Sequence, residues 1–136
     1  MLTPKRQKYR KAHKAKRGGK ATSLVDIAFG SYGLKATTAH WVTSRQIEAA
    51  RRVMTRYTRK GGRIWIRIFP DRPVTQKGGE IPMGKGKGAV DHYIVPIKPG
   101  MVMFEMEGIA EEVAKEAMEN AAYKLPVKSK FVTKDQ

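Results

Sequence analysis

The chain contains no cysteine, which excludes disulfide bonds, thiolate metal sites and a cysteine nucleophile. It also lacks long apolar runs. The longest stretch without Lys, Arg, Asp or Glu spans nine residues, Ala36 to Ser44, whereas a membrane-spanning helix needs about 18. The basic N-terminus is not followed by the apolar stretch of a secretory signal. Secreted disulfide scaffolds and membrane-spanning proteins are therefore not expected.

Acidic residues are scarce: 12 Asp and Glu stand against 28 Lys and Arg, a net charge of +16. The 136 residues are 40% hydrophobic, which is enough for one domain with a packed core. A charge of this size on a small domain predicts a polyanionic partner. Nucleic acid is the first candidate and an anionic membrane surface the second.

The charge is uneven along the chain. Residues 1–20 carry nine basic residues and no acid, residues 21–100 carry 14 and 5, and residues 101–136 carry 5 and 7. We therefore divide the chain into a basic extension (1–22), which cannot fold alone and is expected to meet the polyanion, and one α+β domain (23–136). The alternative for the extension is a flexible solubilising tail. Its candidate RNA-binding residues are Lys5, Arg6, Lys8, Arg10, Lys11, Lys14, Lys16, Arg17 and Lys20.

Residues 24–42 predict two short strands around a turn at residues 30–33. A helix is expected over 44–60, because Thr43 and Gln46 fit a capping box and Gly61 follows as a terminator. The apolar positions at helical spacing are Ile47, Ala50, Met54 and Tyr57.

The opposite face of this helix is basic. Four arginines fall within about 60° of one another on a helical wheel: Arg45, Arg52, Arg56 and Arg59. Glu48 is the only acid in the helix. A solvated face normally mixes signs, so we favour a phosphate-contacting face, for which the planar guanidinium is well suited. The alternative is a merely solvated face.

Residues 63–69 alternate as a strand. Its three isoleucines predict a core face, and Arg63 and Arg67 share the other face with Trp65 and Phe69. Such interleaving of cations and aromatics suits RNA. We favour RNA contact for the two arginines. For the two aromatics, RNA stacking and a second small core remain equally open.

The C-terminal half predicts a long Gly/Lys loop (70–89), a hairpin of strands 90–98 and 101–107 turning at Pro99-Gly100, a helix (109–124) and a last strand (127–133). Glu105 and Glu107 share one strand face, with no partner base in view. The expected apolar face of the helix comprises Ile109, Ala110, Val113, Ala117 and Ala121. Its acidic face, unsuited to RNA, comprises Glu111, Glu112, Glu116 and Glu119.

No motif makes a case for an enzyme. Residues 79–85 fit the start of a phosphate-binding loop, but Gly86 stands where Ser or Thr should bind magnesium, and a strand follows where a helix is required. Residues 84–89 match a loose dinucleotide fingerprint in an equally wrong context. The three histidines lack ligand spacing. We expect no catalytic residue, metal or cofactor.

Several stretches together resemble a known family over essentially the full chain, the bacterial-type ribosomal protein sixteen of the large subunit. They are Met1-Leu2 with Pro4-Lys5-Arg6, Phe29-Gly30 with Tyr32-Gly33-Leu34, residues 46–51 (QIEAAR), 66–71 (IRIFPD), 83–88 (MGKGKG), Lys98-Pro99-Gly100 and Lys124-Leu125-Pro126. The MGKGKG stretch and the strand ending in FPD are the most specific.

The resemblance implies an α/β-hammerhead fold, a mainly antiparallel mixed sheet with two amphipathic helices packed on it. It also implies a structural constituent of the large ribosomal subunit that binds the large rRNA, supports late assembly and lies near the A- and P-site tRNAs. By the same resemblance, the basic extension (1–22) would thread into the rRNA. The tRNA-proximal loop would comprise Met83, Gly84, Lys85, Gly86, Lys87 and Gly88. Neighbouring ribosomal proteins are implied partners, in a bacterial cytoplasm. No membrane partner or homo-oligomer is expected.

The chain departs from the family in the same loop. Pro82 precedes Met83 where members often carry an arginine, and Gly78-Gly79 replaces the usual approach to the loop. One cation near the tRNA is therefore missing. One competing interpretation is a free nucleic-acid-binding protein, although nothing specifies base readout. The other is a membrane-active protein, although the apolar face of the basic helix suits a protein core and the basic extension has almost no apolar face.

Overall fold

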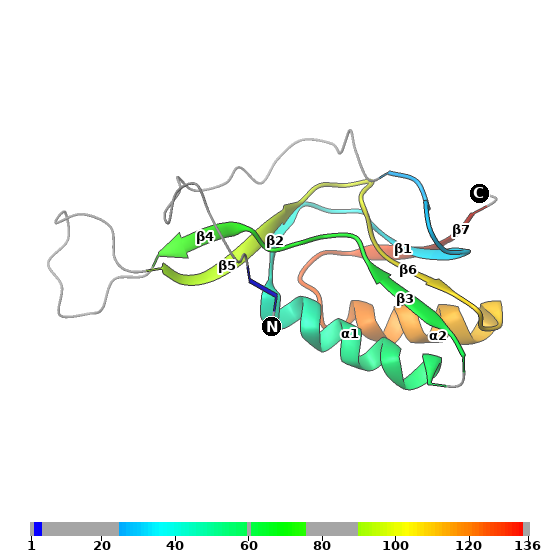
Figure 1. The fold of residues 1–136 in the computed structure, drawn as a ribbon. Coiled ribbons are helices and arrows are strands. Elements are labelled where there is room, and N and C mark those ends of the chain that lie inside the picture. Colours follow the sequence, from blue (N-terminus) through cyan, green and yellow to red (C-terminus); the bar gives the residue numbers. More distant parts are fainter. Residues whose placement is uncertain (1, 4–24, 60, 76–89, 135–136) are drawn as a thin grey trace, which may run out of the picture.

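A computed structural model describes residues 2–3, 25–59, 61–75 and 90–134. Within these ranges the chain forms seven strands and two helices (Figure 1). They are β1 (Tyr32–Ala36), β2 (His40–Thr43), α1 (Ser44–Thr58), β3 (Arg63–Ile66), β4 (Arg72–Thr75), β5 (Val90–Ile97), β6 (Val102–Glu107), α2 (Glu111–Ala122) and β7 (Ser129–Thr133). The predicted α+β class is confirmed. Most of the N-terminal extension and residues 76–89 lie outside the described residues.

The strands form two antiparallel sheets instead of the single mixed sheet expected. The larger has the order β3-β6-β1-β7 and the smaller β2-β5-β4. The predicted hairpin is therefore wrong, because β5 and β6 belong to different sheets. The turn between them docks on β1: Gly100 N–H donates to the Ala36 carbonyl and Ala36 N–H to the Met101 carbonyl, both at 2.8 Å. Gly100 has a φ of 99°, so the chain leaves one sheet and enters the other there.

Part of the predicted 70–89 loop is a strand. Arg72–Thr75 forms β4 and pairs with β5, with Pro73 opposite Tyr93. Pro73 is compatible with the sheet because β4 is an edge strand, where a residue without an N–H group can be accommodated. Figure 1 shows β4 and β5 projecting away from the two helices.

The first predicted strand also differs. Pairing begins only at Tyr32, and Gly33 lies inside β1 instead of in a turn. Residues 25–31 have no regular structure. They run over the sheet, since a Cβ on Gly33 would lie 3.1 Å from the Ile27 side chain. This segment covers the sheet face opposite the helices.

Helix α1 follows its prediction closely. The Thr43 hydroxyl accepts from Gln46 N–H at 3.2 Å and the Gln46 side chain accepts from Thr43 N–H at 2.9 Å, which completes the capping box. Ile47, Ala50 and Met54 are buried, as predicted.

Helix α2 exists where expected, but its buried face is shifted. Ala114 and Met118 are fully buried beside Ala117 and Ala121, whereas Val113 is 37% exposed. The shift arises because α2 packs against α1 as well as against β1 and β7. The contact between α1 and α2 uses alanines, whose weak hydrophobicity gives little signal in the sequence pattern.

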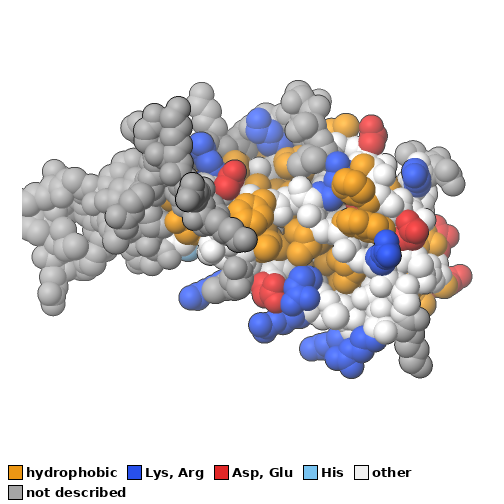
Figure 2. All heavy atoms as spheres, in the orientation of Figure 1, with side chains coloured by type: hydrophobic (Ala, Val, Ile, Leu, Met, Phe, Trp, Pro, Cys, Tyr) orange, Lys and Arg blue, Asp and Glu red, His pale blue; other side chains and the backbone are white. Residues whose placement is uncertain are grey.

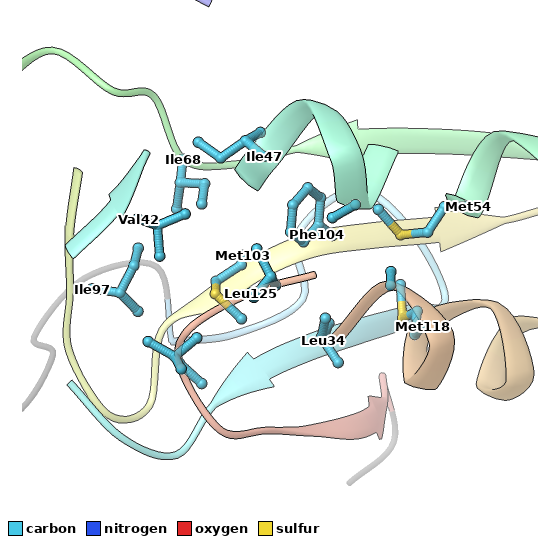
Figure 3. Packing of buried hydrophobic residues seen from close by; sticks show 14 of the residues in the cluster. Leu34, Val42, Ile47, Met54, Ile68, Ile97, Met103, Phe104, Met118 and Leu125 are labelled. Atoms are coloured by element: carbon cyan, nitrogen blue, oxygen red, sulfur yellow. The ribbon is translucent and has the colours of Figure 1, made fainter. Parts of the chain in front are cut away.

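The core lies between the helices and the larger sheet. Figure 3 shows Leu34 and Phe104 from the sheet beside Met54 of α1 and Met118 of α2; all four are at most 1% exposed. Leu2, assigned from sequence to the extension, packs against this cluster. The helices thus bury one sheet face and leave the outer face of α1 free.

Candidate nucleic-acid interface

The four arginines predicted on the outer face of α1 are all exposed: Arg45, Arg52, Arg56 and Arg59. The buried stripe on the opposite side of the same helix fixes this orientation. Figure 2 shows Lys and Arg side chains along the lower edge of the molecule, over α1. Among the described residues, Arg45, Arg56 and Arg59 form no ion pair. Three guanidinium groups are therefore available to phosphates.

Glu48, the one acid on α1, is neutralised within the helix. Its carboxylate lies 2.5 Å from Arg51 Nη2 and 3.4 Å from Arg52 Nε. The hydrogen bond from Arg51 lowers the pKa of Glu48 to about 2, against a smaller opposing effect of desolvation. Glu48 consequently stays ionised and paired, and it does not cancel the charge of the remaining arginines.

A groove between the helices adjoins this stripe. It encloses about 440 Å³ and is lined by Val53, Arg56, Tyr57, Asn120, Tyr123 and Lys124. Asn120 Nδ2 donates to the Tyr57 hydroxyl at 2.8 Å, which ties α2 to α1. The lining contains two cations and no acid, so the basic surface continues from α1 toward the C-terminal end of α2.

The outer side of β3 differs from its prediction. Arg63 is exposed, but the Arg67 side chain is only 11% exposed. Arg67 Nη1 lies 3.0 Å from a carboxylate oxygen of Glu105 and also donates to the Asp26 carbonyl. Glu105 therefore has a cationic partner that the sequence did not predict. Arg67 is engaged inside the protein, whereas Arg63 is exposed on the surface.

Glu105 is fully buried and binds three consecutive backbone N–H groups. Its Oε1 accepts from Phe29 and Gly30, each at 2.7 Å, and its two oxygens accept from Ala28 at 3.1 and 3.2 Å. Burial alone would raise the pKa of Glu105, but these donors and Arg67 outweigh burial and hold the pKa below its usual range. The carboxylate fixes residues 28–30 on the sheet.

Two of the aromatics form a small cluster above this network. The Phe29 ring stacks on Trp65, with centroids 6.1 Å apart and planes at 21°. The Arg67 guanidinium carbon lies 5.7 Å from the Phe29 ring centre. Trp65 is half-buried, which fits the second small core, while Phe69 is 44% exposed. Phe29 itself is 58% exposed, and sequence reasoning did not single it out.

The remaining predicted site residues lie outside the described ranges. They are the nine basic residues of the extension, Lys5 to Lys20, and the six loop residues, Met83 to Gly88. Their roles stay predictions.

Other site types find no support in the described part of the chain. No group of three or more His, Asp or Glu residues there could hold a metal ion. His40 is exposed, and its Nδ1 lies 2.8 Å from the Trp41 carbonyl. No helix within the described ranges has the length and apolar character needed to cross a membrane.

The chain is thus an α+β domain with a net charge of +16 and a helix that exposes arginines on one face. Comparison with known proteins identifies the class. Residues 4–132 match the family described as ribosomal protein L16p/L10e, and the chain belongs to this family of structural, non-enzyme ribosomal proteins. It is 60% identical over 134 residues to the large ribosomal subunit protein uL16 of Halorhodospira halophila, covering 98% of each chain.

Proposed function

We propose that this protein is a structural constituent of the large ribosomal subunit, in a bacterial cytoplasm, that binds large-subunit rRNA through the exposed arginines of α1. The observation that carries the proposal is the set of exposed arginines Arg45, Arg56 and Arg59 on one helix face, which form no ion pair with any residue that the structure describes. The family and its uL16 relative support the ribosomal setting. A folded RNA can be recognised by shape and phosphate position, so no base-reading helix is required.

The proposal extends to two segments beyond the described residues. The basic residues from Lys5 to Lys20 would thread into the rRNA and add phosphate contacts. The loop Met83–Gly88 would approach the A- and P-site tRNAs, because its glycines allow close backbone approach and its two lysines supply charge. Support of late assembly and contacts with neighbouring ribosomal proteins belong to the same proposal.

Arg67 is not part of the proposed contact surface. Its guanidinium is nearly buried and holds Glu105 and the Asp26 carbonyl. Releasing it to a phosphate would leave a buried carboxylate without its counter-ion, which is costly. We therefore assign Arg67 to positioning and keep Arg63 as the contact residue of β3.

The test is a charge reversal on α1. Arg45→Glu with Arg56→Glu changes two exposed residues three turns apart on one helix face. We expect rRNA affinity of the full chain to fall at least tenfold and the log–log salt slope to drop by about 2, since about 1 is lost per phosphate contact. Binding is measured to isolated large-subunit rRNA between 50 and 200 mM salt, the range over which such contacts respond.

A matched control carries the same change in charge elsewhere. Lys115→Glu with Lys128→Glu alters two exposed residues on or after α2. If both double variants bind equally well, the α1 face is merely solvated and the proposed interface is wrong. If only the α1 variant loses affinity, net charge alone does not explain binding and the interface stands.

A further inference from the structure

Phe29 is an exposed aromatic side chain held in place by a buried network. The residue is 58% exposed, yet the N–H groups of residues 28–30 all donate to Glu105, which is fully buried. Exposing a phenylalanine costs free energy, and a buried carboxylate is tolerated only because it is paired and hydrogen-bonded, as Glu105 is here. Their occurrence at one place indicates that the position of this ring is the property being maintained.

The backbone below the ring is held directly against the sheet. A Cβ on Gly30 would lie 2.5 Å from the Met106 carbonyl oxygen, so the chain rests directly on β6. Glu105 binds the segment from the sheet side, and Arg67 holds both Glu105 and the Asp26 carbonyl. Trp65 supports the ring itself at 6.1 Å. Phe29 is consequently pre-organised before any partner arrives.

We propose that Phe29 is a stacking platform for an unpaired base of large-subunit rRNA, held at a fixed position by the Glu105–Arg67 pair. This inference rests on the proposed rRNA binding and names one point of contact within it. A base needs a flat apolar face near cations, whereas a protein partner needs a broad apolar patch. Here one projecting ring stands above Trp65, and the exposed Arg63 lies on the same side of β3.

The platform can be separated from general hydrophobicity by two matched substitutions. Phe29→Ala and Phe69→Ala remove the same side chain from positions that are 58% and 44% exposed. We expect Phe29→Ala to lower affinity for isolated large-subunit rRNA about tenfold, which corresponds to the loss of one stacked base. The salt slope should stay unchanged because no phosphate contact is lost. Phe69→Ala should stay within about twofold of wild type, and Phe29→Trp should retain wild-type affinity.

Glu105 acts through Phe29 in this account, so a double-mutant cycle tests its positioning role. Glu105→Gln should weaken rRNA binding in the wild-type background but have little further effect once Phe29 is alanine. A merely structural role would give additive losses. The control is Glu107→Gln, which changes an exposed carboxylate two residues along β6. It should leave rRNA affinity unchanged in both the wild-type and the Phe29→Ala backgrounds. If Glu105→Gln does not fold, the Phe29 and Phe69 pair still decides the proposal.

The outcomes are distinct. If Phe29→Ala binds isolated rRNA as wild type does, the platform is wrong even though the chain binds rRNA. If that variant binds isolated rRNA normally but fails to join the subunit, the ring contacts a protein, which also overturns the proposal. If the wild-type chain itself shows no affinity for large-subunit rRNA, the proposed function fails first and the platform with it.

Discussion

The two faces of the larger sheet are covered in contrasting ways. On the helix side, side chains such as Leu34, Phe104 and Met106 pack against α1 and α2 in an apolar core. On the other side, residues 25–31 lie over the sheet and are bound by a buried carboxylate and Arg67. The first face is stabilised by area and close packing, and the second by a few directed polar contacts. On the apolar face, stability is spread over many weak contacts, so the loss grows with the number of atoms removed. On the polar face, stability depends on a few individual hydrogen-bonding groups.

The largest effect is expected on the apolar face. Phe104→Ala should destabilise the protein by about 4 kcal/mol, because it removes a fully buried ring and leaves a cavity. Chemical denaturation with and without the change measures this. The control is Val113→Ala on the exposed side of α2, which should cost less than about 1 kcal/mol. Equal losses for the two variants would contradict the assignment of the core.

The next effect is expected from the polar face. Glu105→Gln should cost about 3 kcal/mol of unfolding free energy, since it leaves Arg67 and two or three N–H groups poorly matched. The control is Glu107→Gln, whose side chain is exposed and which should be near neutral. A near-neutral Glu105→Gln would mean that the network does not hold the segment.

Low pH should reduce the difference in unfolding free energy between the wild-type chain and Glu105→Gln. The folded-state pKa of Glu105 lies below its usual range, with burial opposing the shift and the backbone donors and Arg67 producing it. Its contribution to stability is therefore fully present above about pH 4.3, the unfolded value, and is lost as pH falls through the folded pKa. The gap between wild type and Glu105→Gln should shrink over that acidic interval. A gap that widens with acid would contradict the sign.

A smaller loss is expected at the contact between residues 25–31 and the sheet. Gly30→Ala places a Cβ against the Met106 carbonyl, and the backbone must shift to accommodate it. We expect a loss of about 2 kcal/mol, together with weaker protection from hydrogen exchange at Phe29 and Gly30 N–H. Gly61→Ala is an informative comparison because nothing lies within 4 Å of its Cβ position, although its φ of 127° still disfavours alanine. Exchange at Phe29 should respond only to the change at Gly30.

The same contrast explains what the sequence predicted well. Helix α1 has a capping box, a terminating glycine and a regular apolar stripe, and each of these signals is local. The exposure of Arg45, Arg52, Arg56 and Arg59 follows from that stripe alone. Helix α2 buries mainly alanines, and its hydrophobic pattern is therefore weak. The pattern predicted Val113 as buried in place of its neighbour Ala114.

The polar face could not be predicted because its partners are remote in sequence. Glu105 and the N–H groups that it binds are 75 to 77 residues apart. Strand alternation places Glu105 on the face opposite Phe104 and Met106, and nothing local in the sequence indicates that residues 25–31 cover that face. Likewise, the assignment of β5 and β6 to different sheets depends on how their turn docks on Ala36, which strand periodicity does not encode.

The most direct test of the account is sedimentation of a cell lysate on a sucrose gradient, with and without a high-salt wash, while following this chain and its Arg45→Glu, Arg56→Glu variant. We expect the wild-type chain to stay with the large subunit after the wash and the variant to be depleted from it. A wild-type chain that runs free at the top in both conditions would contradict the central claim, and the charge of +16 would then require another polyanion.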